Sequence, residues 1–442
     1  MNATTSSRTP RAARLTPALM GHAETLLAQL LRYDFPADAV VSRYFREHRQ
    51  LGHADRGFVA ETVFAVLRRQ RSLSARVGEA SPSPRQLLLA ALACVRGFNS
   101  RELEHLLYSK ENEALARYKA VQEADLPPAV QADLPDWLYE RLLGQMDAAA
   151  ILALSHSLNQ PAPLDLRVNP LRLKREALLA GLAESGLIAQ PGAYSPLAVR
   201  LQGKPALSRH ALFLDGSFEV QDEGSQLLGF LLAPKRGEAV ADFCAGAGGK
   251  TLLLGALMKN TGRLYAFDVS DKRLANLRPR LARSGLSNVH PARIEHERDQ
   301  KIRRMAGKLD RVLVDAPCSG LGTLRRNPDL KWRQTPESVA ELTQKQAAIL
   351  AAAATLVKPG GRLVYATCSL LADENEAIVT AFLSAHPEFT LLPAADILAA
   401  QGVSEVDGRL APALADGMLR LRPDREGTDG FFAAVLERQR QP

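Results

Sequence analysis

The chain has 442 residues, enough for two or three domains, and 46% of them are hydrophobic, as is ordinary for a globular protein. Its formal net charge of +8 favours an anionic partner, most simply nucleic acid. No apolar stretch is long enough to span a bilayer, and the four cysteines form neither CxxC pairs nor a zinc-like spacing with histidine. We therefore expect a cytoplasmic monomer with reduced thiols, no metal and no membrane contact.

The first part of the chain is predicted to be helical. Residues 1–14 are rich in Ser, Thr and Arg and lack acids, which favours a disordered basic arm over an organellar presequence of similar composition. From residue 15 to 142, apolar residues recur at three- and four-residue spacing, which predicts an all-helical domain. The segments with this spacing are 23–33, 39–49, 56–73 and 84–98. A basic face is expected around Arg68, Arg69, Arg71 and Arg76.

Residues 143–218 are predicted to form a linker followed by a small α/β module. The segment "PLDLRVNPLRL" at 163–173 alternates apolar and polar residues, as a half-buried strand does. The next segment, "KREALLAGLAESGL" at 174–187, has the pattern of a helix that ends at a glycine.

From residue 219 to 442 strand and helix patterns alternate. Such alternation predicts a parallel sheet with helices on both faces. The expected strands are "AVADFC", "RLYAFDV", "NVHPARI", "RVLVDAP" and "RLVYATC", and "GFFAAVLERQ" near the end of the chain is one more.

The stretch "DFCAGAGGKT" at 242–251 lies between the first of these strands and a helical pattern. Its ending fits a phosphate-binding loop, but Cys244 stands where that loop needs its first glycine. The strand and Asp in "DRVLVDAP" could hold magnesium in such a protein. A P-loop NTPase is therefore one interpretation.

A nucleoside-binding turn is the other interpretation. Gly246, Gly248 and Gly249 allow the main chain to approach a ligand and to begin a helix. Such sites place an acid about 20 residues further on, at the end of the next strand, where it bonds ribose hydroxyls. Asp268 ends "RLYAFD" at this position, which favours the nucleoside-binding interpretation.

Two cysteines follow strand ends: Cys318 in "VLVDAPCSG" and Cys368 in "LVYATCS". In a parallel sheet of order 3-2-1-4-5, the ends of the first, fourth and fifth strands are neighbours. Ligands bind at this edge of such sheets, so we expect both thiols and the glycine turn to converge on one crevice. For Cys94 and Cys244 we expect simple packing as small apolar groups.

The motifs "DFCAGAGGKT", "DAPCSGLGTLRRNPDLKW", "VYATCSLLADENE" and "GTDGFFAAVLER" together resemble the NOP/Sun family of S-adenosylmethionine-dependent RNA cytosine-5 methyltransferases, in its bacterial ribosomal-RNA (RsmB-like) branch. The resemblance covers Glu219 to Arg438. It implies a Rossmann-like methyltransferase domain at 219–442, with strand order 3-2-1-4-5 and an antiparallel edge. The helical region 15–142 resembles the NusB-like RNA-binding domain of these enzymes, and the module within 143–218 is expected to add RNA-binding surface.

The resemblance also implies residue roles. Cys368 attacks carbon 6 of cytosine, Cys318 assists product release, Asp315 bonds the cytosine edge or the methionine end of the cofactor, and Lys250 orients the crevice. The residues implied to bind S-adenosylmethionine are Cys244, Ala245, Gly246, Ala247, Gly248, Gly249, Lys250, Asp268, Arg273 and Asp315. The family's usual Asp near the adenine is replaced by Ile294, with Glu295 beside it as a possible substitute.

The loop after Cys318 combines basic residues with an aromatic one, as a surface that contacts phosphates and stacks on an unpaired base does. The residues expected to bind RNA are Arg325, Arg326, Lys331, Trp332 and Arg333. Because a base inside a duplex cannot expose carbon 6 to a thiolate, a flipped or single-stranded cytosine is implied. We expect methylation of small-subunit (16S) ribosomal RNA. The alternatives are a transfer-RNA methyltransferase, a P-loop NTPase and a non-catalytic RNA-binding assembly factor.

Overall fold

The computed structural model describes residues 15–440, which fall into two compact units. The helical unit extends to Asn159 and includes Asn327–Arg333, whereas the α/β unit comprises Gln160–Arg326 and the chain from Gln334 onward. The basic arm expected at 1–14 lies outside the described residues. Between residues 15 and 440, no helix is both long and apolar enough to cross a membrane.

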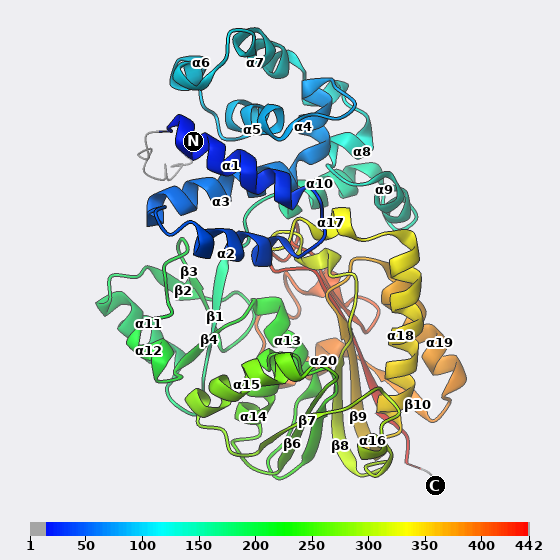
Figure 1. Cartoon of the computed structure of the whole chain (residues 1–442). Coiled ribbons are helices and arrows are strands. Elements are labelled where there is room, and N and C mark those ends of the chain that lie inside the picture. The colour runs from blue at the N-terminus through cyan, green and yellow to red at the C-terminus, as the bar shows by residue number, and fades with distance from the viewer. Residues whose placement is uncertain (1–14, 441–442) are drawn as a thin grey trace. The chain divides into compact units, whose positions relative to one another are not determined.

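The helical unit, drawn mostly in blue and cyan in Figure 1, is built around a core mainly of Leu, Val and Ala side chains, as the apolar spacing predicts. Some of its helices begin at capping residues: Thr16 Oγ1 accepts a hydrogen bond from the N–H of Leu19, and Ser83 forms a capping box with Gln86. The helices are α1 (Pro17–Leu30), α2 (Ala37–Glu47), α3 (His53–Arg68), α4 (Gln70–Val77), α5 (Pro84–Ala90), the π-helical η1 (Ala91–Val95), α6 (Ser100–Leu103), η2 (Glu104–Leu106), α7 (Glu111–Ala120), η3 (Glu123–Asp125), α8 (Pro128–Gln131), α9 (Asp136–Leu143), α10 (Ala148–Leu158) and α17 (Leu330–Arg333).

Two features of the helical unit differ from expectation. The unit continues past residue 142, because α10 packs on α8 and α9 instead of leading into the next module. The expected basic face is partly engaged inside the unit. Arg71 pairs with Asp136 at 2.7 Å, Arg76 donates to the carbonyl oxygens of Tyr118 and Val121, and burial lowers the pKa of Arg68 to about 10.

The α/β unit begins with a small antiparallel sheet of order β2-β3-β1-β4. Leu166 and Val168 of β1 point to a core shared with Leu178 and Leu182 of the following helix, so the alternating strand and the helix predicted here are both present. The elements are β1 (Leu164–Val168), α11 (Arg175–Glu184), β2 (Ala189–Pro191), β3 (Ala198–Leu201), α12 (Ala211–Leu214) and β4 (Phe218–Val220).

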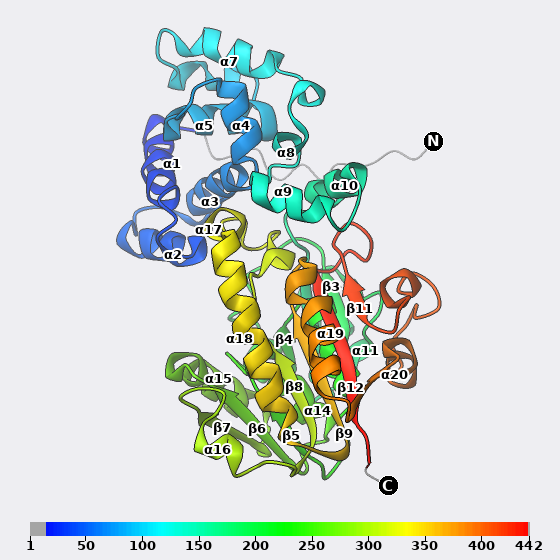
Figure 2. The same cartoon turned by 90° about the vertical axis from the view of Figure 1, so that its right-hand side faces the viewer.

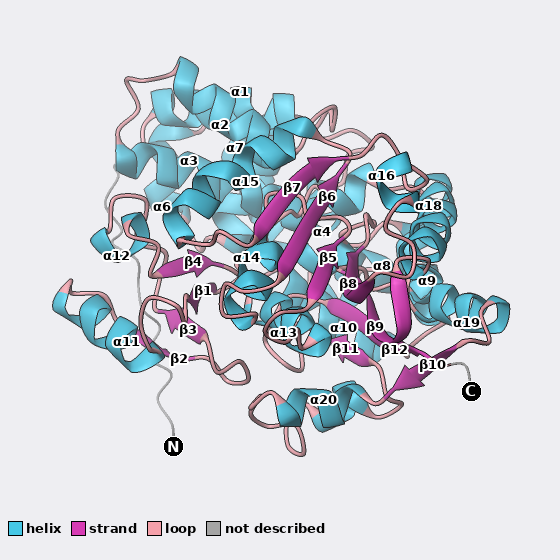
Figure 3. Ribbon diagram, turned by 90° about the horizontal axis from the view of Figure 1, so that it is seen from below, coloured by secondary structure: helices cyan, strands magenta, loops and turns pink. Residues whose placement is uncertain are grey.

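The large sheet has the order β10-β12-β9-β8-β5-β6-β7, and β11 pairs with β12 (Figures 1 and 3). The strands β5 to β9 are parallel, and their order confirms the predicted 3-2-1-4-5 arrangement. The antiparallel edge is also confirmed, because β12 pairs antiparallel with β9 and β10. The strands are β5 (Ala239–Asp242), β6 (Arg263–Asp268), β7 (Val289–Arg293), β8 (Leu309–Asp315), β9 (Val357–Thr367), β10 (Phe389–Leu392), β11 (Leu419–Leu421) and β12 (Phe431–Arg438).

Both faces of the central strands of this sheet are buried, because successive side chains point to opposite faces and helices cover each face. Val240, Leu313 and Val364 face a core shared with α13 and α20, whereas Ala241 and Val312 face a core shared with α18 and α19. Figure 2 shows α18 and α19 side by side along the sheet. The helices of the unit are α13 (Glu223–Leu232), α14 (Gly249–Leu257), α15 (Asp271–Ser284), α16 (Gln300–Arg303), α18 (Pro336–Ala354), α19 (Glu376–Ala385) and α20 (Ala394–Ala400), with short η4 (Leu321–Thr323), η5 (Ala372–Glu374) and η6 (Ala411–Leu414).

Candidate active site

The glycine-rich turn joins the carboxyl end of β5 to the start of α14. Gly248 has a φ of 84°, and a Cβ at this position would lie 2.0 Å from Leu277 Cδ1, so only glycine fits. Gly246 also has a positive φ, of 55°, but a Cβ there would meet no atom within 4 Å. The turn at Gly246 therefore borders open space, as a ligand cradle requires.

Two arginines from distant parts of the α/β unit hold the carbonyl groups of this turn. Arg167 of β1 donates to the Gly249 oxygen at 2.6 Å, and Arg280 of α15 donates to the Ala247 oxygen at 2.6 Å. Arg167 is buried, and burial lowers its pKa to about 10. No pattern in the sequence indicates this support, because the partners lie 82 and 33 residues apart along the chain.

Asp268 ends β6 beside the turn, where the ribose acid was expected. Its Oδ2 accepts the Gly246 N–H at 2.8 Å, and its Oδ1 accepts the Ser270 N–H at 2.7 Å. A carboxylate has about four lone-pair sites, so both oxygens keep acceptor capacity for a ligand hydroxyl. Ile294, after β7, is 2% exposed and donates its N–H to the Asp268 carbonyl, whereas Glu295 is exposed.

Lys250 and Asp315 form an ion pair at the same edge of the sheet, with 2.6 Å between Nζ and Oδ2. Burial alone would lower the pKa of Lys250, but the negative charge of Asp315 more than offsets this, and the pKa is raised. Cys368 contributes to the same rise, so the Lys250 ammonium and a negative charge on Cys368 favour each other.

The two cysteines converge as predicted. Cys318 lies just after β8 and Cys368 directly after β9, and their Sγ atoms are 3.4 Å apart. The hydrogen bond with Cys368 and burial together raise the pKa of Cys318 well above its ordinary value. Cys318 therefore keeps its proton and can donate it to the Cys368 sulfur. Burial likewise raises the pKa of Cys244, which is consistent with the packing role expected for it.

A buried carboxylate that sequence reasoning missed, Glu374 of η5, connects the two cysteine loops. Its Oε1 accepts the N–H of Ser319 at 2.8 Å and the side-chain amide of Gln346 at 2.9 Å. Its Oε2 accepts the hydroxyl of Ser319 at 2.5 Å and that of Ser369. Ser319 and Ser369 each follow a cysteine, so one acid fixes both loops. Glu374 belongs to the motif "VYATCSLLADENE", but nothing in the spacing of that motif indicates this contact.

The structure contradicts the expectation that Arg325 and Lys331 present their charges to RNA. Arg325 is 6% exposed and pairs with Asp429 at 3.0 Å. Lys331 is 2% exposed and donates to the Arg68 carbonyl at 2.7 Å within the helical unit, where burial lowers its pKa to about 7. Neither side chain retains surface for a phosphate.

The other three residues of the expected RNA-binding loop are partly buried. Arg326 pairs with both Asp222 and Asp429, at 3.0 and 2.5 Å. Trp332 donates its ring N–H to the Leu67 carbonyl at 2.8 Å, and Arg333 lies 3.5 Å from an oxygen of Asp329. RNA contacts by these three side chains stay a prediction.

Two further residues predicted to bind the cofactor lie at or near the glycine-rich turn. Arg273 is exposed on α15 and uses its main-chain N–H to bond Ser270 Oγ, which leaves its side chain at the surface near the turn. Ala245 donates its N–H to the Phe267 carbonyl, so the turn is tied to β6. Among residues 15–440, no cluster of three or more His, Cys, Asp and Glu side chains could hold a metal ion.

A doubly wound sheet of this order, with a glycine turn after its first strand and an acid after its second, defines a Rossmann-like methyltransferase domain. The family model described as "16S rRNA methyltransferase RsmB/F" matches residues 229–437, and one described as the RsmF/B-like ferredoxin-like domain matches residues 134–208.

Individual proteins show the same relationship. The chain is 34% identical to a probable ribosomal RNA small subunit methyltransferase B from Synechocystis sp., over 93% of this chain and 98% of that one. A methyltransferase homologue from Pyrococcus horikoshii is 28% identical, with a TM-score of 0.60 over 72% of this chain and all of that one. The structure of PH0851 is 27% identical, with a TM-score of 0.77 over 96% and 99%. This chain belongs to the RsmB/F family of RNA methyltransferases.

Proposed function

We propose that this protein methylates carbon 5 of a cytosine in 16S ribosomal RNA through a covalent bond to Cys368, with S-adenosylmethionine as the methyl donor. The observation that carries the proposal is the pair of thiols 3.4 Å apart at the ends of β8 and β9, beside the glycine turn. Enzymes that methylate exocyclic amines instead hold the amine with an Asp/Asn-Pro-Pro-Tyr motif. Here "DAPC" offers a thiol and no tyrosine.

The cofactor would lie along the turn from Cys244 to Lys250. Asp268 would bond its ribose, and Asp315 would face its methionine end or the cytosine. The open space beside Gly246 and the spare acceptor capacity of Asp268 fit such a ligand. When bound, S-adenosylmethionine supplies the electrophilic methyl group. The adenine contact at Ile294 and Glu295 is then made by main-chain groups or by Glu295.

The side chains present account for the activation of the base. Carbon 5 of cytosine is a poor nucleophile. When the Cys368 thiolate bonds to carbon 6, the double bond between carbons 5 and 6 opens and its electrons make carbon 5 nucleophilic. Lys250, held by Asp315, favours the negative charge on Cys368 before this step.

Product release requires two events after carbon 5 is methylated. A base must remove the proton from carbon 5, and the bond between carbon 6 and the Cys368 sulfur must break. Cys318 lies against Cys368, so its proton can pass to the departing Cys368 sulfur, and the Cys318 thiolate formed in this way can take the proton from carbon 5. This division of roles between the two thiols rests on the family resemblance.

The alternatives are weighed by the same observations. The family to which the chain belongs consists of methyltransferases, which decides against a P-loop NTPase. Lys250 is moreover engaged with Asp315, and Cys244 occupies the position of the missing glycine. A non-catalytic assembly factor would have no use for two paired thiols. A transfer-RNA methyltransferase would use the same chemistry on a different RNA. The experiment below distinguishes the two substrates.

The test combines binding with mapping of the product. The purified protein is expected to bind S-adenosylmethionine and not ATP in titration calorimetry, and to label an unmodified 16S transcript from methyl-tritiated cofactor. Bisulfite sequencing of RNA from a deletion strain is expected to show one 16S cytosine that has lost its protection. If only transfer RNA were labelled, the substrate would be transfer RNA and not 16S ribosomal RNA. Labelling at another atom or base would refute methylation of carbon 5 of cytosine.

Replacing Glu374 with alanine tests whether the cysteine loops need their shared acid. The change leaves buried donors on Ser319 and Gln346 unpaired, so we expect a loss of about 3 kcal/mol in the free energy of unfolding. Misplacement of the thiols should lower kcat by roughly 10²-fold, while affinity for S-adenosylmethionine stays unchanged. Urea unfolding, kinetics and calorimetry measure these three quantities.

The matched control is Glu376→Ala, two residues further on. Glu376 pairs with Arg420 and is partly exposed, so its loss should cost less than about 1 kcal/mol and leave kcat unchanged. If both variants lower kcat equally, Glu374 has no special part in placing the thiols.

A further inference from the structure

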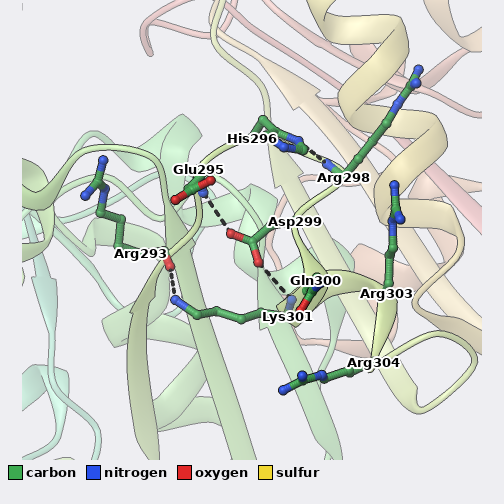
Figure 4. A pocket seen from close by; sticks show the side chains of 9 residues that line it. All are labelled: Arg293, Glu295, His296, Arg298, Asp299, Gln300, Lys301, Arg303 and Arg304. Atoms are coloured by element: carbon green, nitrogen blue, oxygen red, sulfur yellow. Dashed lines mark hydrogen bonds between the residues drawn. The ribbon is translucent and has the colours of Figure 1, made fainter.

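A basic hollow of about 600 Å³ lies at the end of β7 and shares only Glu295 with the site described above (Figure 4). It is formed by the segment that follows β7 and by α16 with the residue after it. The lining residues are Arg293, Glu295, His296, Arg298, Asp299, Gln300, Lys301, Arg303 and Arg304. Five of these nine side chains are cationic and two are acidic.

The acid at the centre of the hollow, Asp299, is committed to the main chain. Its Oδ1 accepts the Lys301 N–H at 2.8 Å, and its Oδ2 accepts the Glu295 N–H at 2.9 Å. These hydrogen bonds lower the pKa of Asp299. Lys301 in turn donates to the Arg293 carbonyl at 2.6 Å. This network fixes the shape of the segment and leaves Asp299 poorly placed to neutralise the arginines.

The arginines are the groups available to a ligand. Arg298, Arg303 and Arg304 are exposed, and Figure 4 shows the side chains of Arg298 and Arg303 extending away from the central Asp299. Arg303 and Arg304 make no side-chain ion pair or hydrogen bond with any residue in the described part of the chain, and Arg298 reaches only Glu297, at 3.7 Å. His296 accepts the Arg298 N–H on Nδ1 at 3.1 Å, which leaves its Nε2 as a donor.

The position of the hollow relates it to the thiols. It follows the carboxyl end of β7, the same edge of the sheet that carries Cys318 and Cys368. Four strand spacings separate β7 from β9, and at about 4.8 Å each this amounts to about 19 Å. A group in the hollow is therefore too far away to be the reacting base. At this distance, the hollow can bind the backbone of the same RNA strand a few nucleotides away from the reacting base.

We propose that this basic hollow binds backbone phosphates of the substrate RNA on one side of the target cytosine. The inference rests on the proposed function for the nature of the substrate and adds a contact surface to it. Guanidinium groups bind phosphate oxygens with paired N–H donors, and phosphate contacts position a nucleic acid without reading its sequence. The hollow thus sets the direction in which the strand leaves the active site.

The test reverses three charges: Arg298→Glu, Arg303→Glu and Arg304→Glu in one protein. Binding of an unmodified 16S transcript is measured over a range of salt concentrations. Each phosphate contact to a single strand contributes about 0.7 to the slope of log K against log salt, so the slope should fall by about two. Affinity at moderate salt should weaken about tenfold or more, with kcat at saturating RNA and affinity for S-adenosylmethionine unchanged.

The control carries the same charge change at the opposite edge of the sheet: Lys235→Glu, Arg236→Glu and Arg263→Glu. These exposed residues precede or begin β5 and β6, so they lie at the amino ends of the strands. The control is expected to bind RNA with nearly the wild-type slope. Equal slopes for the two variants would overturn the proposal, since net charge alone would then explain the effect. A wild-type protein that neither binds nor methylates the transcript would refute the proposed function instead.

Discussion

Cys368→Ala is expected to abolish methyl transfer, with a fall in kcat of roughly 10⁴-fold or more. Without the sulfur, carbon 6 receives no nucleophile and carbon 5 stays unreactive. The alanine removes one atom from a partly exposed position at the end of β9, so the fold should be unaffected. Transfer of tritium from labelled S-adenosylmethionine to the 16S transcript measures the activity, and calorimetry checks that the cofactor still binds.

Cys94→Ala is the matched control for this experiment. Cys94 lies in η1 of the helical unit, and burial raises the pKa of its thiol, so it is an inert packing residue. The control should retain wild-type activity. If Cys368→Ala also retained activity, the covalent route through Cys368 would be refuted, whatever the identity of the methylated base.

The architecture was predictable from the sequence because local patterns determine it. Each central strand is a short apolar run, and the helical segments between them force right-handed crossovers and a parallel order. Given that order, the ends of β8 and β9 must be neighbours, so two cysteines 50 residues apart were expected to converge on one crevice, and the structure brings them into contact. The glycine turn was predictable for the same reason, since Gly248 and Gly246 need conformations that other residues avoid.

The charged loop after Cys318 shows where such reasoning fails. Arginine and lysine are usually exposed, so Arg325 and Lys331 were expected at the surface. Their burial depends on partners that sequence proximity cannot reveal. Asp429 lies 104 residues after Arg325, and the carbonyl bound by Lys331 belongs to Arg68, 263 residues earlier. Whether a charged side chain is buried depends on its partner. When the partner is distant in sequence, only the folded structure identifies it.

The opposite error concerns the basic hollow. The segment "RIEHERDQKIRR" contains three acids interspersed among five cations, so its sequence did not suggest an anion site. In the structure, the acidic and the basic side chains of this segment have different surroundings. Asp299 accepts hydrogen bonds from main-chain amides, while Arg303 and Arg304 are exposed. The net charge of a segment therefore does not determine the electrostatic potential at its surface in the folded protein.

Cys318→Ala is expected to trap a covalent complex between protein and RNA. The attacking sulfur of Cys368 is intact in this variant, so addition to carbon 6 and methylation proceed. Elimination lacks the thiol that lies 3.4 Å from the Cys368 sulfur, and the adduct accumulates. Incubation with 16S transcript and S-adenosylmethionine should give a slowly migrating band on a denaturing gel, stable to boiling and removed by ribonuclease. Turnover should cease after about one methyl group per protein.

The double variant Cys318→Ala with Cys368→Ala decides which sulfur holds the RNA. It should form no adduct, because the only thiol proposed to attack carbon 6 is gone. If Cys318→Ala releases RNA normally while Cys368→Ala alone traps it, the two roles are reversed. That reversal would require Cys318 to act as the anion, and the raised pKa of its thiol disfavours this, so the gel also tests the electrostatic argument for the assignment. An adduct in the double variant would point to a nucleophile other than either thiol.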